Sequence, residues 1–452
     1  MLISAPVFRF AAATFVVVSI ALAEPALAQD KPGDWLTRLF QSLMPGPAPA
    51  PGGGIREWSG QSGASGSPLM TAEAIRAAAA GFGNCLSALE PQAERRGISR
   101  AAFERFTAGL TADLSIMDLL DGQPEFNKSI WDYLDAMVSD ERIARGRELL
   151  AQNATMFDAV ERAYGVDRHI VAAIWGLESK YGTTGGDRPV IRSTATLACV
   201  GRRRDHFREE FLSALEILDR GDVKPDHLIG SWAGGFGPTQ FMPTTFKRYA
   251  VDFDGDGRRD LVDSVPDYIA STANKLKSDG WVSGEGWGYE VVLPANFNYL
   301  LADGARQMTI DQWKTMGIKR ADDESFSRAS DSAYLLLPAG ARGPAFLMLE
   351  NFRVIMKYNP AEAYALAVGH LADRLRGGGL LVQSWPRDER VLTVAECYEL
   401  QQLLGRRGFD AGEPNGRLGP RTRIAIRNFQ VATGQIPDGF ASSGVLDLLR
   451  QP

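Results

Sequence analysis

The chain has 452 residues, of which 45% are hydrophobic and 23% charged, proportions typical of an ordinary globular protein with room for two or more domains. Its formal net charge is −6 at pH 7. Proteins that bind nucleic acid usually present a basic face, so this charge argues against nucleic acid as a partner and against adhesion to anionic polymers by charge alone.

The first 28 residues have the form of a secretory signal peptide. Arg9 supplies a weakly basic start, residues 10–23 form an apolar run, and the small residues at 26–28 make a cleavage site. The run is short for a membrane span, so we expect cleavage and export to the periplasm with no stable span left. A retained N-terminal anchor is the alternative.

Residues 29–70 are rich in Pro, Gly and Ser. Such a segment buries too little apolar surface to offset the entropy lost on ordering, so the composition predicts a flexible tether. A short amphipathic piece at residues 35–43 interrupts it and is either a docking helix or a spacer.

Helical periodicity dominates residues 71–279, and this pattern predicts a mainly α region. Residues 281–349 instead hold short apolar runs broken by Gly and Pro, such as YEVVLP at 289–294, which predict a small β-containing insertion. The helical pattern resumes at Asn351 and ends near Leu375, before a Gly-rich linker. We therefore assign residues 71–380 to one region of the α+β class, mainly α.

One acid in this region stands where a hydrophobic residue is expected. In HIVAAIWGLESKYG at 169–182, a helix turning by about 100° per residue places Glu178 within an apolar arc. The arc is formed by Ile170, Ile174, Leu177 and Tyr181. A carboxyl group with little water around it holds a proton more readily near neutral pH and can act as a general acid, as glycosidic-bond cleavage requires. The alternative is a glutamate at the helix edge that reaches solvent or a salt bridge.

Three motifs occur in order along the chain: WGLESKYG at 175–182, SWAGGFGPTQFMPTTF at 231–246 and NFRVIMKYNPAEAYALAV at 351–368. Together they resemble the membrane-bound lytic murein transglycosylase B family, which has a lysozyme-like core. The resemblance covers residues 71–380. It implies an enzyme that acts on peptidoglycan glycan strands, cleaves the β-1,4 bond between N-acetylmuramic acid and N-acetylglucosamine without adding water, and leaves 1,6-anhydromuramoyl ends. A hydrolytic muramidase and a non-catalytic wall-binding scaffold are the alternatives.

The resemblance also implies which residues form the site. Glu178 matches a single catalytic glutamate that acts first as acid and then as base. Residues of the second and third motifs are expected to contact the substrate or to orient the acid: Ser231, Gln240, Tyr358, Asn359 and Tyr364. Tyr364 is alternatively a core residue. FGPT at 236–239 departs from the MGYG sequence that is more usual in the family, which leaves the local subsite preference open.

The segment DFDGDGRRDLVD at 252–263 follows the EF-hand calcium pattern, with Asp263 in place of the usual last Glu. The family carries such a loop at this place, and there the last ligand comes from the start of the next helix. The implied ligands of a structural calcium ion are Asp252, Asp254, Asp256, the Arg258 carbonyl and Asp267, with Asp263 in reserve. An acidic turn that holds no metal is the alternative, and no organic cofactor is expected.

Three cysteines are present, so at least one is unpaired within the chain. Cys85 and Cys199 fall in the same region whereas Cys397 lies beyond it, and two readings stay open: a bridge between the first two, or three buried thiols. 

The last part of the chain, residues 389–452, forms a separate unit. NGRLGPRTRIAIRNFQ at 415–430, followed by Asp438 and Gly439, resembles the small three-helix peptidoglycan-binding module of cell-wall enzymes. A module that serves only as a spacer or in dimerisation is the alternative.

Overall fold

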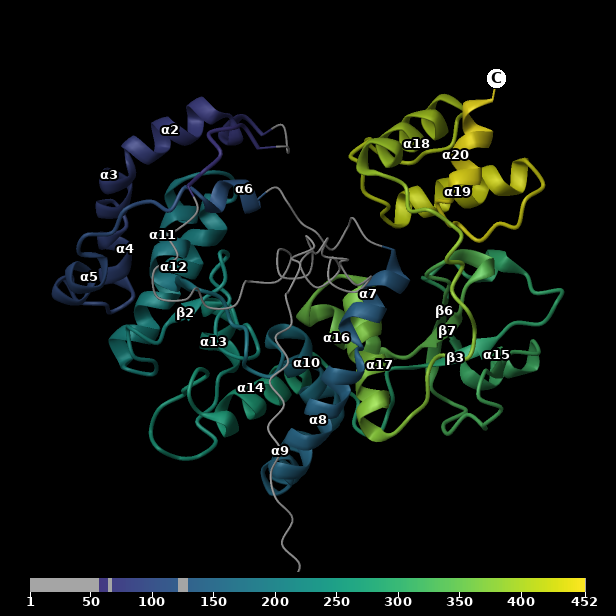
Figure 1. Cartoon of the computed structure of the whole chain (residues 1–452), viewed down its shortest axis with the longest axis horizontal. Helices are drawn as coiled ribbons and strands as arrows, with labels where there is room; N and C mark the ends of the chain where they lie inside the picture. Colours follow the sequence, from purple (N-terminus) through teal and green to yellow (C-terminus); the bar gives the residue numbers. More distant parts are fainter. Residues whose placement is uncertain (1–56, 64–66, 121–128, 452) are drawn as a thin grey trace, which may run out of the picture.

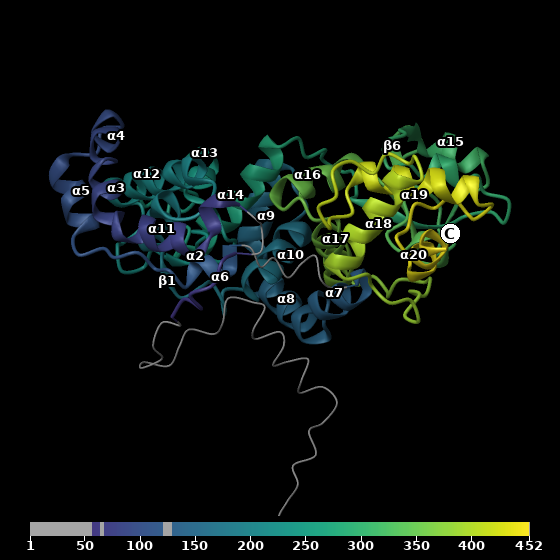
Figure 2. The same ribbon diagram turned by 90° about the horizontal axis from the view of Figure 1, so that it is seen from above.

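The computed structural model describes residues 57–63, 67–120 and 129–451. The predicted signal peptide at 1–28 and the amphipathic piece at 35–43 lie outside these ranges. Figures 1 and 2 show the chain laid out in a row, from the helices α2 to α6 at one end, through a central helical body, to a sheet and the C-terminal helices at the other. Across the three described ranges, no helix is both long and apolar enough to cross a bilayer.

Helices build most of the molecule before the sheet. After a 3-10 turn η1 (Pro68–Met70), the first group consists of α2 (Ala72–Ala80), α3 (Phe82–Ser87), α4 (Glu90–Arg95), α5 (Arg100–Thr107), α6 (Ile116–Leu120), α7 (Ile130–Met137), α8 (Asp140–Gln152), α9 (Ala154–Tyr164) and α10 (Arg168–Ser179). The second group consists of α11 (Val190–Cys199), α12 (Arg204–Arg220), α13 (Pro243–Tyr249) and α14 (Val265–Ser278). A short antiparallel pair is formed by β1 (Arg188–Pro189), which precedes α11, and β2 (Ile229–Gly230), which follows α12. Helices α16 (Glu350–Tyr358) and α17 (Glu362–Arg376) return to this body after the sheet.

Helix α10 is the central element of the helical body. The Asp167 side chain caps its start by accepting a 2.7 Å hydrogen bond from the His169 backbone N–H, and Lys180 ends it in a left-handed conformation. Residues 170–177 are buried on every face, so α10 is not the one-sided amphipathic helix that the sequence suggests. Tyr181 lies beyond the helix end and is therefore not part of its apolar arc.

Two glycines make room for the Tyr181 ring. A Cβ atom at Gly146 of α8 would lie 2.1 Å from the Tyr181 hydroxyl, and one at Gly176 of α10 would lie 2.6 Å from Cζ. A side chain at either position would clash with the ring, so the spacing of α8, α10 and the turn after α10 depends on both glycines. Ser179, the last residue of α10, directly precedes this turn.

The predicted β-containing insertion is confirmed. It contains a five-stranded antiparallel sheet of order β4-β6-β7-β3-β5, formed by β3 (Gly288–Val292), β4 (Met308–Thr309), β5 (Lys319–Arg320), β6 (Ser332–Leu336) and β7 (Ala345–Met348). Helix α15 (Ile310–Thr315) covers a second, separate core, in which the fully buried Trp313 donates a 3.0 Å hydrogen bond to the Ala333 carbonyl. Two further 3-10 turns, η3 (Tyr299–Leu301) and η4 (Gly340–Arg342), lie in its loops.

The C-terminal unit is a three-helix module, as predicted, made of α18 (Val394–Arg406), α19 (Pro420–Ala432) and α20 (Ser443–Arg450) around its own core. It packs beside the sheet (Figures 1 and 2). Asp438 Oδ2 accepts a 2.8 Å hydrogen bond from the Ala341 backbone, and Arg427 donates to the Ala302 carbonyl. Arg423 of α19 forms a two-pronged salt bridge to Glu362 of α17, at 2.9 and 3.0 Å. The module is thus attached to both the sheet and the central helical body.

The predicted tether is shorter than the range 29–70. Its last part packs on the protein: Met70 is fully buried, the Ser59 hydroxyl donates a 2.6 Å hydrogen bond to Asp118, and Arg76 lies 5.3 Å from the centre of the Trp58 ring. The polar composition of the segment did not predict this packing, because one tryptophan and one methionine supply the apolar contacts.

A disulfide joins Cys85 of α3 to Cys199 of α11, with the two Cα atoms 5.9 Å apart, while Cys397 is a buried free thiol. Of the two readings left open by the sequence, the Cys85–Cys199 bridge is therefore confirmed. The bond links residues 114 positions apart.

Candidate active site and metal loop

Glu178 and Tyr364 meet where α10 and α17 pack together. Glu178 is half-buried at the C-terminal end of α10, and its Oε1 accepts a 2.6 Å hydrogen bond from the Tyr364 hydroxyl. Tyr364 is buried, and burial together with the nearby Glu178 carboxylate raises its pKa well above the usual value. The hydroxyl therefore keeps its proton and acts as a fixed donor to the acid. Tyr364 is both a core residue and a partner of Glu178, so the two readings of this position are compatible.

Ser179, the neighbour of Glu178, connects the first motif to the second. Its hydroxyl donates a 2.5 Å hydrogen bond to the Pro238 carbonyl and accepts one of 2.8 Å from the Gly182 backbone. Ser179 is fully buried, so these bonds are shielded from water. They hold the Gly-rich segment at a set distance from the end of α10.

Tyr358, at the end of α16, secures the same segment from the other side. Its hydroxyl donates a 2.6 Å hydrogen bond to the Thr239 carbonyl, and burial and the Glu178 carboxylate raise its pKa well above the usual value. The Lys275 ammonium of α14 lies 5.1 Å from the centre of the Tyr358 ring and 2.6 Å from Asp279 Oδ2. A buried cation over the face of a phenol ring attracts it electrostatically and helps to hold it in place.

The other predicted substrate contacts form hydrogen bonds with the backbone of nearby loops. The Gln240 amide donates to the carbonyls of Gly185 and Gly237 at 3.0 and 2.9 Å, and Gln240 itself has a left-handed φ of 51°. The Ser231 hydroxyl accepts a 3.0 Å bond from the Gly235 backbone. Asn359 Oδ1 accepts from the Ala361 backbone at 3.1 Å. All three side chains are half-buried, so they keep exposed surface while shaping the loops around Glu178.

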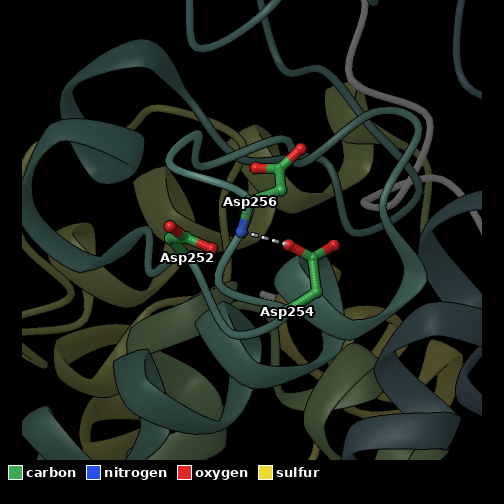
Figure 3. A group of neighbouring side chains, drawn as sticks. All are labelled: Asp252, Asp254 and Asp256. Atoms are coloured by element: carbon green, nitrogen blue, oxygen red, sulfur yellow. Dashed lines mark hydrogen bonds between the residues drawn. The ribbon is translucent and has the colours of Figure 1, made fainter.

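Three of the predicted metal ligands lie together. One carboxylate oxygen from each of Asp252, Asp254 and Asp256 lies within 4.8 Å of the other two, and Figure 3 shows the three side chains around one turn of chain. The turn is stabilised internally, since Asp252 accepts bonds of 2.7 and 2.8 Å from the Gly255 and Gly257 backbones. Closely spaced, exposed carboxylate oxygens are the donor set that a calcium ion prefers, so these residues fit the ion.

Asp267 and Asp263 have other hydrogen-bond partners than the three clustered aspartates. Asp267, fully buried in the first turn of α14, accepts hydrogen bonds from the loop backbone, at 2.8 Å from Phe253 and 2.8 Å from Asp260. It ties the loop to the helix through these contacts. Asp263, the reserve ligand, instead pairs with His227 Nδ1 at 2.6 Å. The Arg258 side chain pairs with Asp256 Oδ2 at 2.9 Å.

The chain matches models of two known protein families. Residues 81–373 match the model of the transglycosylase SLT domain. The chain belongs to this transglycosylase family. A second match, over residues 393–449, is to a putative peptidoglycan binding domain and covers α18 to α20.

Individual relatives agree with this assignment. The transglycosylase is 28% identical over 300 residues to membrane-bound lytic murein transglycosylase B of Escherichia coli K12, an alignment that covers 64% of this chain and 81% of the relative. It is 45% identical to SltB3 from Pseudomonas aeruginosa in complex with NAG-anhNAM-pentapeptide, with a TM-score of 0.79 over 82% of this chain and 99% of that one. The Escherichia coli lytic transglycosylase Slt35 in complex with calcium is 25% identical, with a TM-score of 0.56 over 70% of this chain and 95% of that one.

Sequence reasoning missed two residues that position the site in this transglycosylase. Ser179 stands next to Glu178 inside the first motif, but its hydrogen bond to Pro238 spans 59 positions and has no local signal. Lys275 lies on a helix with an ordinary amphipathic pattern, where a lysine is normally solvent-exposed. Its 8% exposure is visible only once α14 and α16 are packed.

Proposed function

We propose that this protein is a lytic transglycosylase of peptidoglycan in which Glu178 is the only catalytic acid and base. The observation that carries the proposal is the half-buried Glu178 carboxylate, which accepts a 2.6 Å hydrogen bond from the buried Tyr364 at the meeting point of the first and third motifs. A carboxyl group in such a place is oriented by its partner and can exchange a proton with a bound substrate.

The chemistry proceeds in two proton transfers. Protonated Glu178 gives its proton to the oxygen that leaves the muramoyl anomeric carbon, and the N-acetyl group of the substrate stabilises the cationic centre. The Glu178 carboxylate then removes the proton of the muramoyl C6 hydroxyl, whose oxygen closes onto the anomeric carbon. The product is a 1,6-anhydro end, and no water is consumed.

Mass spectrometry of digested sacculi tests this function. The wild type should release muropeptides with anhydro ends, which are one water lighter than reducing ends, and Glu178→Gln should release none while still binding sacculi. Glu141→Gln, at an exposed position of α8, is the matched control and should retain activity. Products with only reducing ends would establish a hydrolase instead, and a wild type that releases nothing would establish a binding scaffold.

Three finer assignments accompany this proposal. A structural calcium ion would be held by Asp252, Asp254 and Asp256, together with the Arg258 carbonyl and Asp267. The close carboxylate oxygens of the first three residues support this choice, as does the calcium complex of Slt35. When bound, the ion would neutralise the clustered carboxylates. The C-terminal module binds the wall. Export to the periplasm is supported by the signal-like first 28 residues and by a disulfide, which persists in oxidising compartments.

A further inference from the structure

A cleft separate from Glu178 lies between the central helices and the sheet. It has a volume of about 710 Å³ and is lined by the start of α10, the end of α17, strand β3 and the linker at residues 378–382. This volume is within the range of sites that bind small ligands. Ile170 in its wall precedes Glu178 by eight residues on α10, which corresponds to about 12 Å along the helix axis. The cleft therefore shares two helices with the candidate active site but not its residues.

The lining of this cleft carries an excess of negative charge. Six carboxylates lie there with two guanidinium groups, an excess of four negative charges: Asp167, Glu285, Glu290, Asp322, Glu324 and Asp373, with Arg320 and Arg376. A concave surface with an excess of one sign concentrates its field, so this cleft attracts cations and repels anions. Phosphates, nucleotides and carboxylate-rich peptides are thereby excluded as ligands.

Two of the six acids lack a cationic partner. The other four share the two arginines, in the groups Asp167–Arg376–Asp373 and Asp322–Arg320–Glu324. Glu290 of β3 instead accepts hydrogen bonds of 2.8 and 2.7 Å from the backbone N–H groups of Val382 and Gln383. Glu285 accepts one of 3.2 Å from the Asn351 backbone. Neither glutamate makes an ion pair with any residue that the structure describes, so both can serve as counter-charges for a ligand.

The surroundings of Glu285 favour a cation in particular. Burial raises the pKa of Glu285, and the nearby Asp331 carboxylate acts in the same direction. Arg328 is also close, but it pairs with Asp331 at 2.8 Å. The ionised form of Glu285 is therefore disfavoured in the empty cleft, and a cation placed beside it would remove this cost.

His370 of α17 adds a buried polar group that has no partner. The side chain is only 7% exposed and lines the cleft, yet its ring makes no hydrogen bond within the described ranges. Burial and the nearby Arg374 lower its pKa to about 4, so at neutral pH the ring is uncharged and one of its nitrogens is an acceptor. Buried polar groups normally have partners, so the ring indicates a ligand that completes its hydrogen bonding. An ammonium group, which carries only donors, fits an uncharged imidazole.

The spacing of the acids distinguishes an organic cation from a metal ion. Among the described residues, the one group of three or more acid, histidine or cysteine side chains close enough to share an ion lies outside this cleft, at Asp252, Asp254 and Asp256. A metal ion such as calcium needs several oxygen ligands at once. The acids of the cleft are too far apart to supply them, so the cation that fits has separated charges.

Aromatic rings lie along the same wall as the two free acids. Glu285 and Glu290 are five positions apart, so their Cα atoms are separated by at most about 17 Å of extended chain. Trp281, Trp287 and Tyr289 line the cleft with them. Aromatic rings pack against methylene groups and attract ammonium groups over their faces. This wall suits a ligand with cationic groups joined by an apolar chain.

We propose that this cleft binds a linear polyamine, a chain of methylene groups that carries several ammonium groups. Glu285 and Glu290 are the counter-charges for two of these groups, His370 accepts a hydrogen bond from one, and the aromatic rings cover the methylene chain. The inference rests on the cleft alone and is independent of the proposed function. Because the cleft lies between α10, α17, β3 and the linker, a bound polyamine would hold the sheet against the helical body.

Calorimetric titration of the full-length protein with spermidine at low ionic strength tests the proposal. We expect one saturable site, with a Kd weakened about tenfold in Glu285→Gln and in Glu290→Gln because each removes a close counter-charge. Spermidine acetylated at both terminal amines should also bind about tenfold more weakly. Both glutamine variants keep an oxygen acceptor for the backbone N–H groups, so they report on charge. His370→Leu should weaken binding and His370→Gln, which keeps an acceptor, should restore most of it.

The matched control is Asp256→Asn, which removes the same charge from the acidic turn outside the cleft and should bind spermidine like the wild type. Spermidine should also raise the melting temperature of the wild type more than that of Glu285→Gln. The proposal is overturned by absence of saturable binding, by equal affinity for the acetylated compound, or by an unchanged Kd in both glutamate variants. Equal weakening in Asp256→Asn and the cleft variants would show attraction to the net charge of the protein and would also overturn it. If His370→Leu fails to fold, the glutamate variants decide the result.

Discussion

The Tyr364 hydroxyl of α17 donates a 2.6 Å hydrogen bond to Glu178 Oε1 of α10. A hydrogen bond to a charged group contributes about 1.5–3 kcal/mol, so Tyr364→Phe should lower kcat by about 10- to 150-fold. Muropeptide release from sacculi measures this. Tyr398→Phe removes an exposed hydroxyl on α18 and should leave kcat unchanged. Full activity of Tyr364→Phe would show that the acid needs no fixed donor.

The buried pair Lys275 and Asp279 leads to a second prediction. Lys275→Met keeps the length of the side chain but removes the cation 5.1 Å from the Tyr358 ring, and a cation–π contact contributes about 0.5–2 kcal/mol. We expect kcat to fall by about 3- to 30-fold with little change in KM, because Tyr358 acts through Thr239 on the loop beside Glu178.

The variant Lys275→Arg tests whether kcat depends on the charge of this side chain or on its packing. It retains the cation and should recover most of kcat, while melting temperatures of both variants report any loss of stability from the unpaired Asp279. Equal loss of kcat in the Met and Arg variants would contradict a role for the charge.

The local parts of this structure were predictable and the long-range parts were not. Periodicity and turn residues identified the helical region and the β insertion, because these patterns depend on neighbours a few positions apart, whereas the three-helix module was predicted from its resemblance to peptidoglycan-binding modules. The Tyr364–Glu178 bond spans 186 positions and the Tyr358–Thr239 bond 119. The family resemblance predicted that both tyrosines lie near Glu178, but the bond to Thr239 had no signal in the sequence. The partial burial of Trp58 and the burial of Lys275 depend on packing between elements, which composition and periodicity do not report.

Calcium should stabilise the protein through the loop after α13. Adding millimolar calcium to chelated protein should raise the melting temperature, because the ion neutralises three carboxylates that lie within 4.8 Å of one another. Asp256→Asn removes one ligand charge and should reduce the shift. Asp263→Asn alters the acid that pairs with His227 and serves as the control. An unchanged melting temperature in the wild type would refute the site.

Protonation of His370 should destabilise the fold in acid. Its pKa is about 4 in the folded protein against 6.5 when unperturbed, so the unfolded chain binds the proton first as pH falls. Stability is fully present above pH 6.5 and is lost as pH falls towards 4, by about 3 kcal/mol for this one group. Urea unfolding at several pH values should show a shallower slope for His370→Gln than for the wild type. Equal slopes in the wild type and in His370→Gln would contradict the assignment.

The salt bridge between Arg423 and Glu362 has a consequence for how the enzyme meets its substrate. Glu362 lies two residues before Tyr364 on α17, so the helix that orients the catalytic acid is also the helix that anchors the C-terminal module. A module on a loose linker would search a volume and deliver glycan strands in every orientation. A module in contact with both the sheet and α17 would instead hold a bound strand at a set distance from Glu178, so the proposed wall binding predicts cuts at a defined position along the glycan.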